Sequence, residues 1–427
     1  MGKWEVGGAS RSGDVLSLDA ESPPLFVLYV PGLDHRRLAP DRAPQIASLR
    51  EAHPTVVLRT LPDVDLTPTL MTGTLPHEHG VWQVSLPGPR SRDRTLSERA
   101  IDLLPDIVST TAQGIGHATT GDVDLAAIPP ERRRRLKLHR FKYQRRLKNW
   151  LEPSERVPSI FSLLGDRQSR YHMASEFSEL RRLVPQLPSA DCRLEWLEFY
   201  GFDLAEHWNL DRPRLMDDAL SRVDRAVGAL RDSCRSRDIR FLLLSDHGQE
   251  RVSEWFDLID GLSELDVPDA DYDYFMQPVY ARFWFHTDHA RRTISQYLSG
   301  LDVVNVRTYR EMHEHGVKFE SDAYGELYAY ASPGTAFFPH DFHQPLANLY
   351  MGVTHSWQRP RIFDPRHRGC HGYLGESPSE RGFLLCADDR IDVVPDQIHI
   401  SEVAPALIRL AGGTPPAYMR DGRVFET

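Results

Sequence analysis

A carboxylate and an imidazole stand four residues apart in the segment Asp203-Leu-Ala-Glu-His207. Side chains at this spacing lie on the same side of one helical turn, so both can reach a single cation. The same spacing also fits an ordinary pair on the exposed surface of a helix. Taken alone, the segment predicts either a metal-binding turn or a solvated helix surface.

Three further ligand-type residues occur later in the chain. Asp246 and His247 form the middle of a Ser-Asp-His-Gly segment, directly after the apolar residues 240–244. Two adjacent residues on a tight loop point to different sides, which suits two neighbouring ions better than one; a plain polar turn is the alternative. His371 lies in a Gly-Cys-His-Gly segment, where a single histidine is most often a turn residue.

Hydrophobic patterning predicts the elements that position these residues. Continuous apolar runs indicate buried strands, and they cover residues 25–30, 55–58, 193–199 and 240–244. Helical periodicity and capping signals cover residues 40–51, 155–164 and 211–235. Strands that alternate with helices predict an α/β fold with a doubly wound sheet, in which ligands bind at the carboxyl ends of the strands.

Composition limits the classes of protein that this chain can belong to. Hydrophobic residues make up 41% and charged residues 26% of the 427 residues, which allows a large core. The formal net charge of -10 argues against broad nucleic-acid binding. We find no apolar run long enough for a membrane span, no signal-peptide pattern after Lys3 and no CxxC pair, so we expect a cytoplasmic, reduced protein without a membrane segment.

The motifs follow the order found in one known family. The Asp-x-x-x-His, Ser-Asp-His-Gly and late His-Gly segments resemble those of the type I phosphodiesterase / nucleotide pyrophosphatase family of the alkaline phosphatase superfamily. Similar segments also occur at residues 31–34, 71–80, 222–226, 403–412 and 421–423. The resemblance covers most of residues 25–427 and implies a three-layer α/β/α sandwich with inserted cap segments.

The resemblance implies a single alkaline phosphatase-like domain over residues 20–427, with two stretches that look like insertions. Residues 250–345 contain acidic and aromatic segments that could form a cap. Residues 110–152 contain a basic run from Arg132 to Lys148. That run fits a solvated helix, and it equally fits a lid that attracts an anionic substrate.

The resemblance also implies a centre of two neighbouring zinc-type ions that binds and polarises phosphate. By resemblance, Asp203, His207 and His371 hold one ion, whereas Asp246 and His247 belong to the other. The implied function is metal-dependent hydrolysis of phosphoric esters or anhydrides, on an anionic small-molecule substrate that contains phosphate. A binding or accessory protein with an altered site is the alternative, and transfer or cleavage of an unusual phosphorus or sulfur ester is a third. We expect one or two divalent ions, zinc first and manganese second; the sequence indicates no oligomeric state.

Several positions depart from the family's pattern. Pro31 stands where the family has its first metal-binding aspartate, and its side chain has no ligand atom. Asp63 stands nine residues before Thr72, where the family has a nucleophilic threonine or serine. The asparagine that helps to hold the phosphate is absent too; Val84 takes its place, with Gln83 beside it as a candidate substrate contact.

These departures leave three hypotheses for the catalytic residues. Asp63 can replace the missing metal ligand, with water as the nucleophile. Alternatively, a local shift of the loop makes Thr67 the nucleophile, with Asp63 or Asp65 as a ligand. In the third hypothesis the site is degenerate, and the protein binds its ligand without hydrolysing it. Asp34, close to Pro31, is a spare carboxylate that we expect to be a solvated loop acid.

Overall fold

The computed structural model describes residues 16–62, 65–82, 85–86, 142–143, 151, 154, 156–189, 191–319, 322–341, 343, 345–374, 377–391 and 395–420. The chain divides into two compact units. Three stretches form the first unit, Met1–Trp82, Lys148–Gln249 and Pro378–Thr427. Two stretches form the second, Gln83–Leu147 and Glu250–Ser377.

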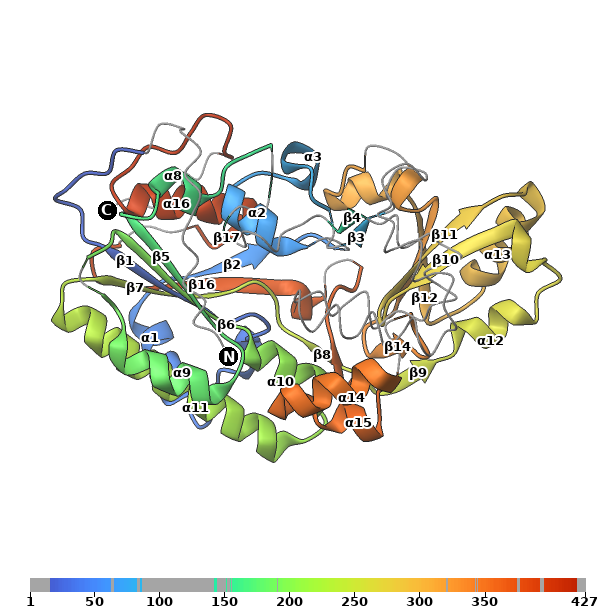
Figure 1. Cartoon of the computed structure of the whole chain (residues 1–427), viewed down its shortest axis with the longest axis horizontal. Helices are drawn as coiled ribbons and strands as arrows, with labels where there is room; N and C mark the ends of the chain where they lie inside the picture. Colours follow the sequence, from blue (N-terminus) through green and yellow to red (C-terminus); the bar gives the residue numbers. More distant parts are fainter. Residues whose placement is uncertain are drawn as a thin grey trace, which may run out of the picture. The chain divides into compact units, whose positions relative to one another are not determined.

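A seven-stranded sheet forms the centre of the first unit, in the order β17-β2-β16-β7-β1-β6-β5 (Figure 1). Its strands in chain order are β1 (Leu25–Tyr29), β2 (Thr55–Arg59), β5 (Ser169–Ala174), β6 (Leu194–Phe199), β7 (Arg240–Ser245), β16 (Arg381–Ala387) and β17 (Gln397–His399). Strands β5, β6, β1 and β7 run parallel to one another, whereas β16 runs antiparallel to β7 and β2. The predicted α/β sheet is confirmed, with one reversed strand that the sequence pattern did not predict.

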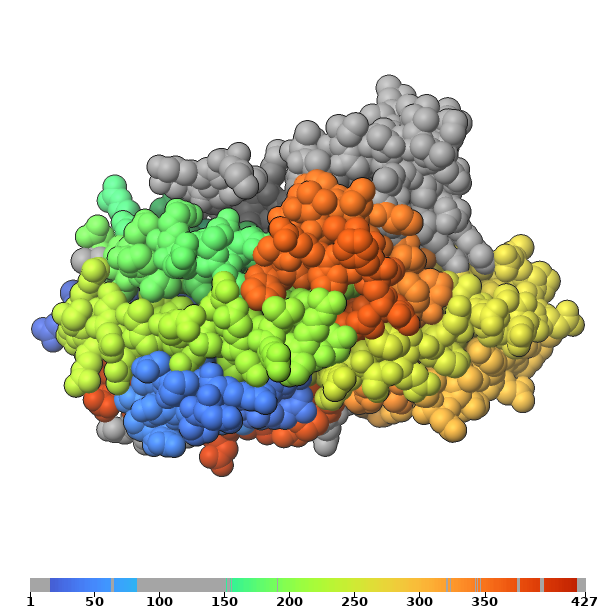
Figure 2. Space-filling model, turned by 90° about the horizontal axis from the view of Figure 1, so that it is seen from below, coloured from blue at the N-terminus to red at the C-terminus, as the bar shows by residue number. Residues whose placement is uncertain are grey.

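Helices cover both faces of this sheet, and together they give the predicted three-layer α/β/α sandwich (Figure 1). On one face lie α2 (Leu66–Thr72), α8 (Ile160–Leu164) and α16 (Val403–Leu410). On the other lie α1 (Pro44–Ala52), α9 (Phe177–Leu183) and α11 (Pro213–Ser236). Figure 2 looks onto this second face, where α1 and α11 pack side by side.

Side chains of β1 alternate between the two helical layers. Leu25, Val27 and Tyr29 belong to the core that includes residues of α2, α8 and α16. Phe26 points to the opposite face and stacks on Phe241 of β7. All of these side chains are buried. A strand that is covered on both faces needs apolar residues on both sides, which explains its continuous hydrophobic run.

Three parallel strands end at the same level of the sheet. In the ladders, Tyr29 of β1 pairs with Leu244 of β7 and with Glu198 of β6. Because their carboxyl ends are level, the segments that follow them leave the sheet at one edge. Those segments carry Asp203 after β6 and Asp246 after β7. The register of the strands therefore brings ligand-type side chains from distant parts of the sequence together.

The second unit has a four-stranded antiparallel sheet, in the order β10-β11-β13-β12. These strands are β10 (Tyr272–Met276), β11 (Tyr280–Phe285), β12 (Val304–Thr308) and β13 (Leu327–Ala331). Its helices are α12 (Leu258–Ser263), α13 (Asp288–Ser299), α14 (Pro345–Thr354) and α15 (Pro360–Phe363). Short two-stranded pairings join β9 (Glu254–Phe256) to β14 (Thr335–Phe337), β8 (Glu250–Arg251) to β15 (Gly369–Cys370), and β3 (Ser85–Leu86) to β4 (Lys142–Tyr143).

The strands and helices predicted from hydrophobic patterning all occur, with ends that differ by up to five residues. The predicted cap, residues 250–345, lies in the second unit, and its role as a cap stays a prediction. The predicted basic insertion, residues 110–152, lies outside the described residues apart from 142, 143 and 151. In the described part of the chain, no helix is both long and apolar enough to cross a membrane.

Candidate metal centre

Asp203 and His207 lie on α10 (Gly201–Asn209), a helix that begins two residues after β6 ends. His207 Nε2 is 3.5 Å from Asp203 Oδ2, so the two side chains share one side of a helical turn, as their spacing predicts. Asp203 is buried, whereas the pair on a solvated helix surface would leave it exposed. The arrangement presents a carboxylate and an imidazole to the same space.

Gln249 holds the carboxylate of Asp203 in place. Its side-chain Nε2 donates a hydrogen bond of 2.6 Å to Asp203 Oδ1, and Gln249 is fully buried. The loop after β1 approaches the same carboxylate through Gly32, which has a φ of +78°. A Cβ at this glycine would come within 3.0 Å of Asp203 Oδ1, so both the backbone angle and the space require glycine there.

Asp246 and His247 are buried at the end of β7. Asp246 Oδ1 accepts a hydrogen bond of 3.0 Å from the backbone N–H of His247, and Oδ2 accepts one of 2.7 Å from the phenol of Tyr29. His247 Nδ1 donates to the carbonyl of Gly248 at 2.9 Å. This contact fixes the ring and leaves Nε2, 3.4 Å from Asp246 Oδ2, as the nitrogen that can bind a cation.

The electrostatics around His247 favour positive charge. Burial alone would lower the pKa of His247, but the carboxylates of Asp246 and Asp203 outweigh it and raise that pKa above 6.5. Burial raises the pKa of Asp246 above its ordinary value, although His247 opposes this. Burial opposes the charged form of each group, whereas the carboxylate and the imidazole each favour the charged form of the other.

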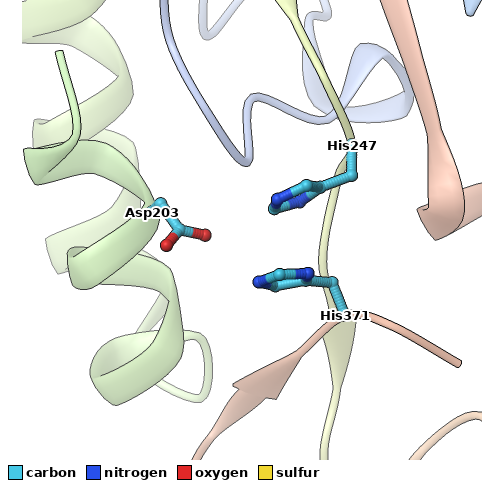
Figure 3. Close-up of side chains that lie close together, drawn as sticks. All are labelled: Asp203, His247 and His371. Atoms are coloured by element: carbon cyan, nitrogen blue, oxygen red, sulfur yellow. The ribbon is translucent and has the colours of Figure 1, made fainter. Parts of the chain in front are cut away.

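His371 directly follows β15, whose Cys370 pairs with Glu250 of β8. Since Glu250 is three residues after His247, this short ladder brings the two histidines close together. Figure 3 shows their rings beside the carboxylate of Asp203. One ligand atom from each of the three side chains lies within 4.8 Å of the others. Two imidazole nitrogens and one carboxylate oxygen form a donor set that suits zinc.

This group of three combines residues that the resemblance assigned to different ions. Asp203 and His371 come from the first predicted ligand set, and His247 comes from the second. The structure thus brings most of the predicted ligands to one edge of the sheet. Their division into two ion sites, and the role of each side chain as a ligand, stay predictions.

A second cluster of buried charge adjoins this centre. Arg36 Nη2 donates to Asp34 Oδ2 at 2.6 Å, and Arg37 Nη1 donates to Glu206 Oε1 at 2.8 Å. Asp34 is only 1% exposed, so the prediction of a solvated loop acid is wrong. Burial raises the pKa of Glu206 to about 8, even though Arg37 acts in the opposite direction.

Among the predicted catalytic and substrate-binding residues, Asp63 and Gln83 lie outside the described part of the chain. Thr67 is half-buried in the first turn of α2. Its backbone N–H donates to Oδ1 of Asp65 at 3.1 Å, which makes Asp65 the N-cap of that helix. Asp65 is therefore engaged in capping, and the role of Thr67 as a nucleophile stays a prediction.

Thr69 and His79 form a buried contact between α2 and α3 (Pro76–His79). His79 Nδ1 accepts the backbone N–H of Val81 at 3.1 Å, so its Nε2 carries the proton that bonds Thr69 Oγ1 at 3.0 Å. Burial lowers the pKa of His79 to about 3. This histidine is therefore neutral at physiological pH and connects the two helices.

Sequence reasoning missed two residues of the centre. Tyr29 belongs to an apolar run and therefore looked like an ordinary core residue, yet its phenol contacts Asp246. Gln249 directly follows the Ser-Asp-His-Gly segment, and its amide contacts Asp203. Their positions in the sequence could have indicated a role in the centre. Tyr29 lies two residues before Pro31, and Gln249 lies close to the predicted ligands Asp246 and His247.

Comparisons with known proteins agree with this architecture. The model of the family "Type I phosphodiesterase / nucleotide pyrophosphatase" matches residues 25–373. Human ectonucleotide pyrophosphatase / phosphodiesterase 5 is structurally similar, with a TM-score of 0.60 and 13% identity over 95% of this chain and 100% of the other. The murine protein gives 0.59 and 12% over 94% and 100%. An inactive threonine-to-alanine variant of the murine protein, in complex with AMP, gives 0.59 and 12% over 95% and 100%.

A search of curated protein sequences finds no match to this chain. At such low identity the structural likeness establishes the fold alone, whereas the family model spans most of the sequence. The protein therefore belongs to the type I phosphodiesterase / nucleotide pyrophosphatase family.

Proposed function

We propose that this protein is a metal-dependent hydrolase of phosphoric diesters or phosphoric anhydrides. Membership of the family supports this class of reaction. The observation that carries the proposal is the convergence of Asp203, His247 and His371 at the carboxyl edge of the sheet. A nucleotide is the first substrate class to test, because a relative of the same fold is described in complex with AMP.

The side chains of this centre fit a divalent ion. Two imidazole nitrogens and a carboxylate suit zinc better than manganese, which prefers more oxygen ligands. Negative charge from Asp203 and Asp246, which raises the pKa of His247, favours a cation there. When bound, a divalent ion would supply Lewis acidity that polarises a phosphoryl oxygen and offsets its negative charge.

The chain's own contacts would hold these side chains ready for an anionic substrate. Gln249 orients the carboxylate of Asp203 through Oδ1, and the carbonyl of Gly248 orients the ring of His247 through Nδ1. Such supporting hydrogen bonds fix the direction of each donor atom before any ligand arrives. Less reorganisation is then needed when a substrate binds.

The test is hydrolysis of bis(4-nitrophenyl) phosphate and of a dinucleoside pyrophosphate by protein that is stripped of metal and reloaded with zinc or manganese. We expect turnover only after reloading, and we expect Asp203→Asn and His247→Ala to reduce it by more than about 100-fold. Asp218→Asn and His286→Ala are matched controls at exposed ion pairs and should retain activity.

A binding or accessory role is the second candidate, and Pro31 is the observation that favours it. The residue stands where the family places a metal-binding aspartate, and it supplies no ligand atom. If metal-loaded protein turns over neither substrate, nor a wider panel of phosphoesters and anhydrides, but still binds AMP through Asp203 and His247, the non-hydrolytic function replaces the first proposal.

A further inference from the structure

The second unit contains a helical hairpin, residues 345–363, that exposes an unusual amount of apolar surface. This α14–α15 hairpin consists of α14, the 3-10 turn η7 (Ser356–Gln358) and α15, which pack against one another (Figure 1). Half of the exposed large hydrophobic side chains in the described part of the chain belong to it, namely Leu349, Tyr350, Val353 and Phe363. Single exposed apolar residues are common on protein surfaces, whereas a cluster of them marks a binding surface.

The exposed apolar side chains come from one compact element. Leu349 and Tyr350 precede Val353 by four and three residues, so all three share one face of α14. Gly352 allows α15 to approach closely, because a Cβ at this position would collide with the side chain of Ile362. Val353 and Phe363 directly follow these two contacting residues, so their side chains start from neighbouring points of the backbone. Phe363 is 88% exposed.

The inner side of the hairpin carries polar side chains. Asn348 and Gln358 are buried there. Arg361 Nε donates to Asn348 Oδ1 at 2.5 Å, and its Nη1 donates to Gln358 Oε1 at 3.0 Å. A helix that faces water normally has apolar residues inside and polar residues outside. The reversed arrangement of this hairpin indicates that its outer side meets an apolar environment.

The charges of the hairpin are basic. Residues 342–363 contain no aspartate or glutamate, although the whole chain has a formal net charge of -10. Arg359 is exposed between η7 and α15. Asp364, the first acid after the hairpin, forms ion pairs with Arg366 and Arg368. An exposed apolar patch with basic and without acidic side chains fits the acyl chains and anionic headgroups of a lipid surface.

We propose that the α14–α15 hairpin binds peripherally to an anionic lipid surface, with its apolar side chains among the acyl chains and Arg359 at the headgroups. Tyr350 suits the boundary, since its ring is apolar and its hydroxyl is polar. A second copy of this chain fits less well, because a two-fold contact through this face would bring like charges of the two copies together. The inference goes beyond the proposed function and requires no hydrolysis.

The test is flotation of the full-length protein with lipid vesicles at low ionic strength. One set contains phosphatidylcholine alone, and the other contains equal parts of phosphatidylcholine and phosphatidylserine. We expect binding to the anionic vesicles to be more than about 10-fold stronger and to weaken with added salt. Val353→Ser and Phe363→Ser should each lower the partition coefficient by at least about 5-fold, because each removes an apolar side chain from the acyl region. Arg359→Gln should lower it by about 5-fold.

Met173→Ser and Leu215→Ser are the matched apolar controls, because both side chains are exposed but belong to the first unit. Arg214→Gln, at an exposed arginine of α11, is the control for charge. These controls should bind like the wild type. Since every substituted side chain is exposed, we expect all the variants to fold, and circular dichroism checks this.

Three outcomes would overturn the inference. The first is no binding to either set of vesicles, or binding that the hairpin variants retain in full. The second is equal binding to neutral and anionic vesicles, which would exclude recognition of anionic headgroups. The third is a lipid-free dimer that Phe363→Ser dissociates in analytical ultracentrifugation, which would assign this face to self-association. None of these outcomes affects the proposed hydrolase, whose turnover is measured on soluble substrates.

Discussion

Two pairs of buried carboxylates lie at the same strand ends, and the protein treats them in opposite ways. Asp34 and Glu206 each accept a hydrogen bond from an arginine. Asp203 and Asp246 instead accept hydrogen bonds from neutral groups, an amide and a phenol, and each lies beside the imidazole of a histidine. All four side chains are less than a tenth exposed, so burial does not explain the difference.

The partners of a buried carboxylate therefore distinguish a structural cluster from a candidate functional one. A buried charge costs several kcal/mol unless it is compensated. The first pair is compensated within the chain, which makes it a closed unit that fixes the loop after β1 to α10. The second pair faces the imidazoles of His207 and His247, which can carry a proton or bind a metal ion, and this makes it a candidate metal centre.

The largest expected effect comes from removing an arginine of the compensated pair. Arg37→Ala leaves Glu206 buried without its cation, and Arg37 also donates to the carbonyl of Gln249 at 2.9 Å. We expect the free energy of unfolding to fall by about 3 kcal/mol, the low end for a broken buried pair, because Arg37 is partly exposed. Urea unfolding of the metal-free protein measures it. Arg42→Ala, at an exposed pair with Asp217, is the control and should change little.

The second prediction concerns the pair formed by Asp203 and Asp246 and has the opposite sign. Asp203→Asn removes one of two buried negative charges, so the metal-free protein should be as stable as the wild type or slightly more stable. Zinc at about 100 times its dissociation constant should stabilise the wild type by about 2.7 kcal/mol and the variant hardly at all. Thermal unfolding with and without zinc measures both effects. A loss of metal-free stability as large as that of Arg37→Ala would break the comparison.

A smaller effect is expected where a neutral donor supports the pair formed by Asp203 and Asp246. Gln249→Leu removes the amide that orients Asp203. We expect zinc affinity to fall by about 10- to 100-fold, as for other partners of metal ligands. Competition with a chromophoric chelator measures the affinity. Gln186→Leu, at an exposed glutamine, is the matched control; equal affinities in both variants would show that Gln249 has no part in the centre.

The smallest effect is expected at Thr67, which adjoins the helix cap and not the carboxylate pairs. Thr67→Ala keeps the backbone N–H that Asp65 accepts, so stability should change by less than about 0.5 kcal/mol. We expect most of any hydrolytic activity to remain, whereas Asp63→Ala should lose activity together with metal. The measurements are turnover of an aryl phosphodiester and metal content. Lost turnover in Thr67→Ala at unchanged metal content would instead assign the nucleophile to its hydroxyl.

Local patterns were enough to predict much of this fold. The apolar runs that became β1 and β7 show their burial directly in their residue types, and the amphipathic period of α11 does the same. The reversed direction of β16 could not be predicted in this way. The hydrophobic pattern of a buried strand does not depend on whether the strand is parallel or antiparallel to its neighbours. Only the pairing of β16 with β7 and β2 decides its orientation.

The residues of the candidate centre also fall into those that the sequence predicts and those that only the tertiary structure reveals. The sequence by itself determined which residue types could bind a metal, because Asp203 with His207 and Asp246 with His247 are close in the chain. Only the tertiary structure decided that Asp34 is neutralised and that Tyr29, 217 residues before Asp246, donates to its carboxylate. The physical reason is that the charge of a buried group depends on its neighbours in space, and the register of β1 with β6 and β7 selects those neighbours.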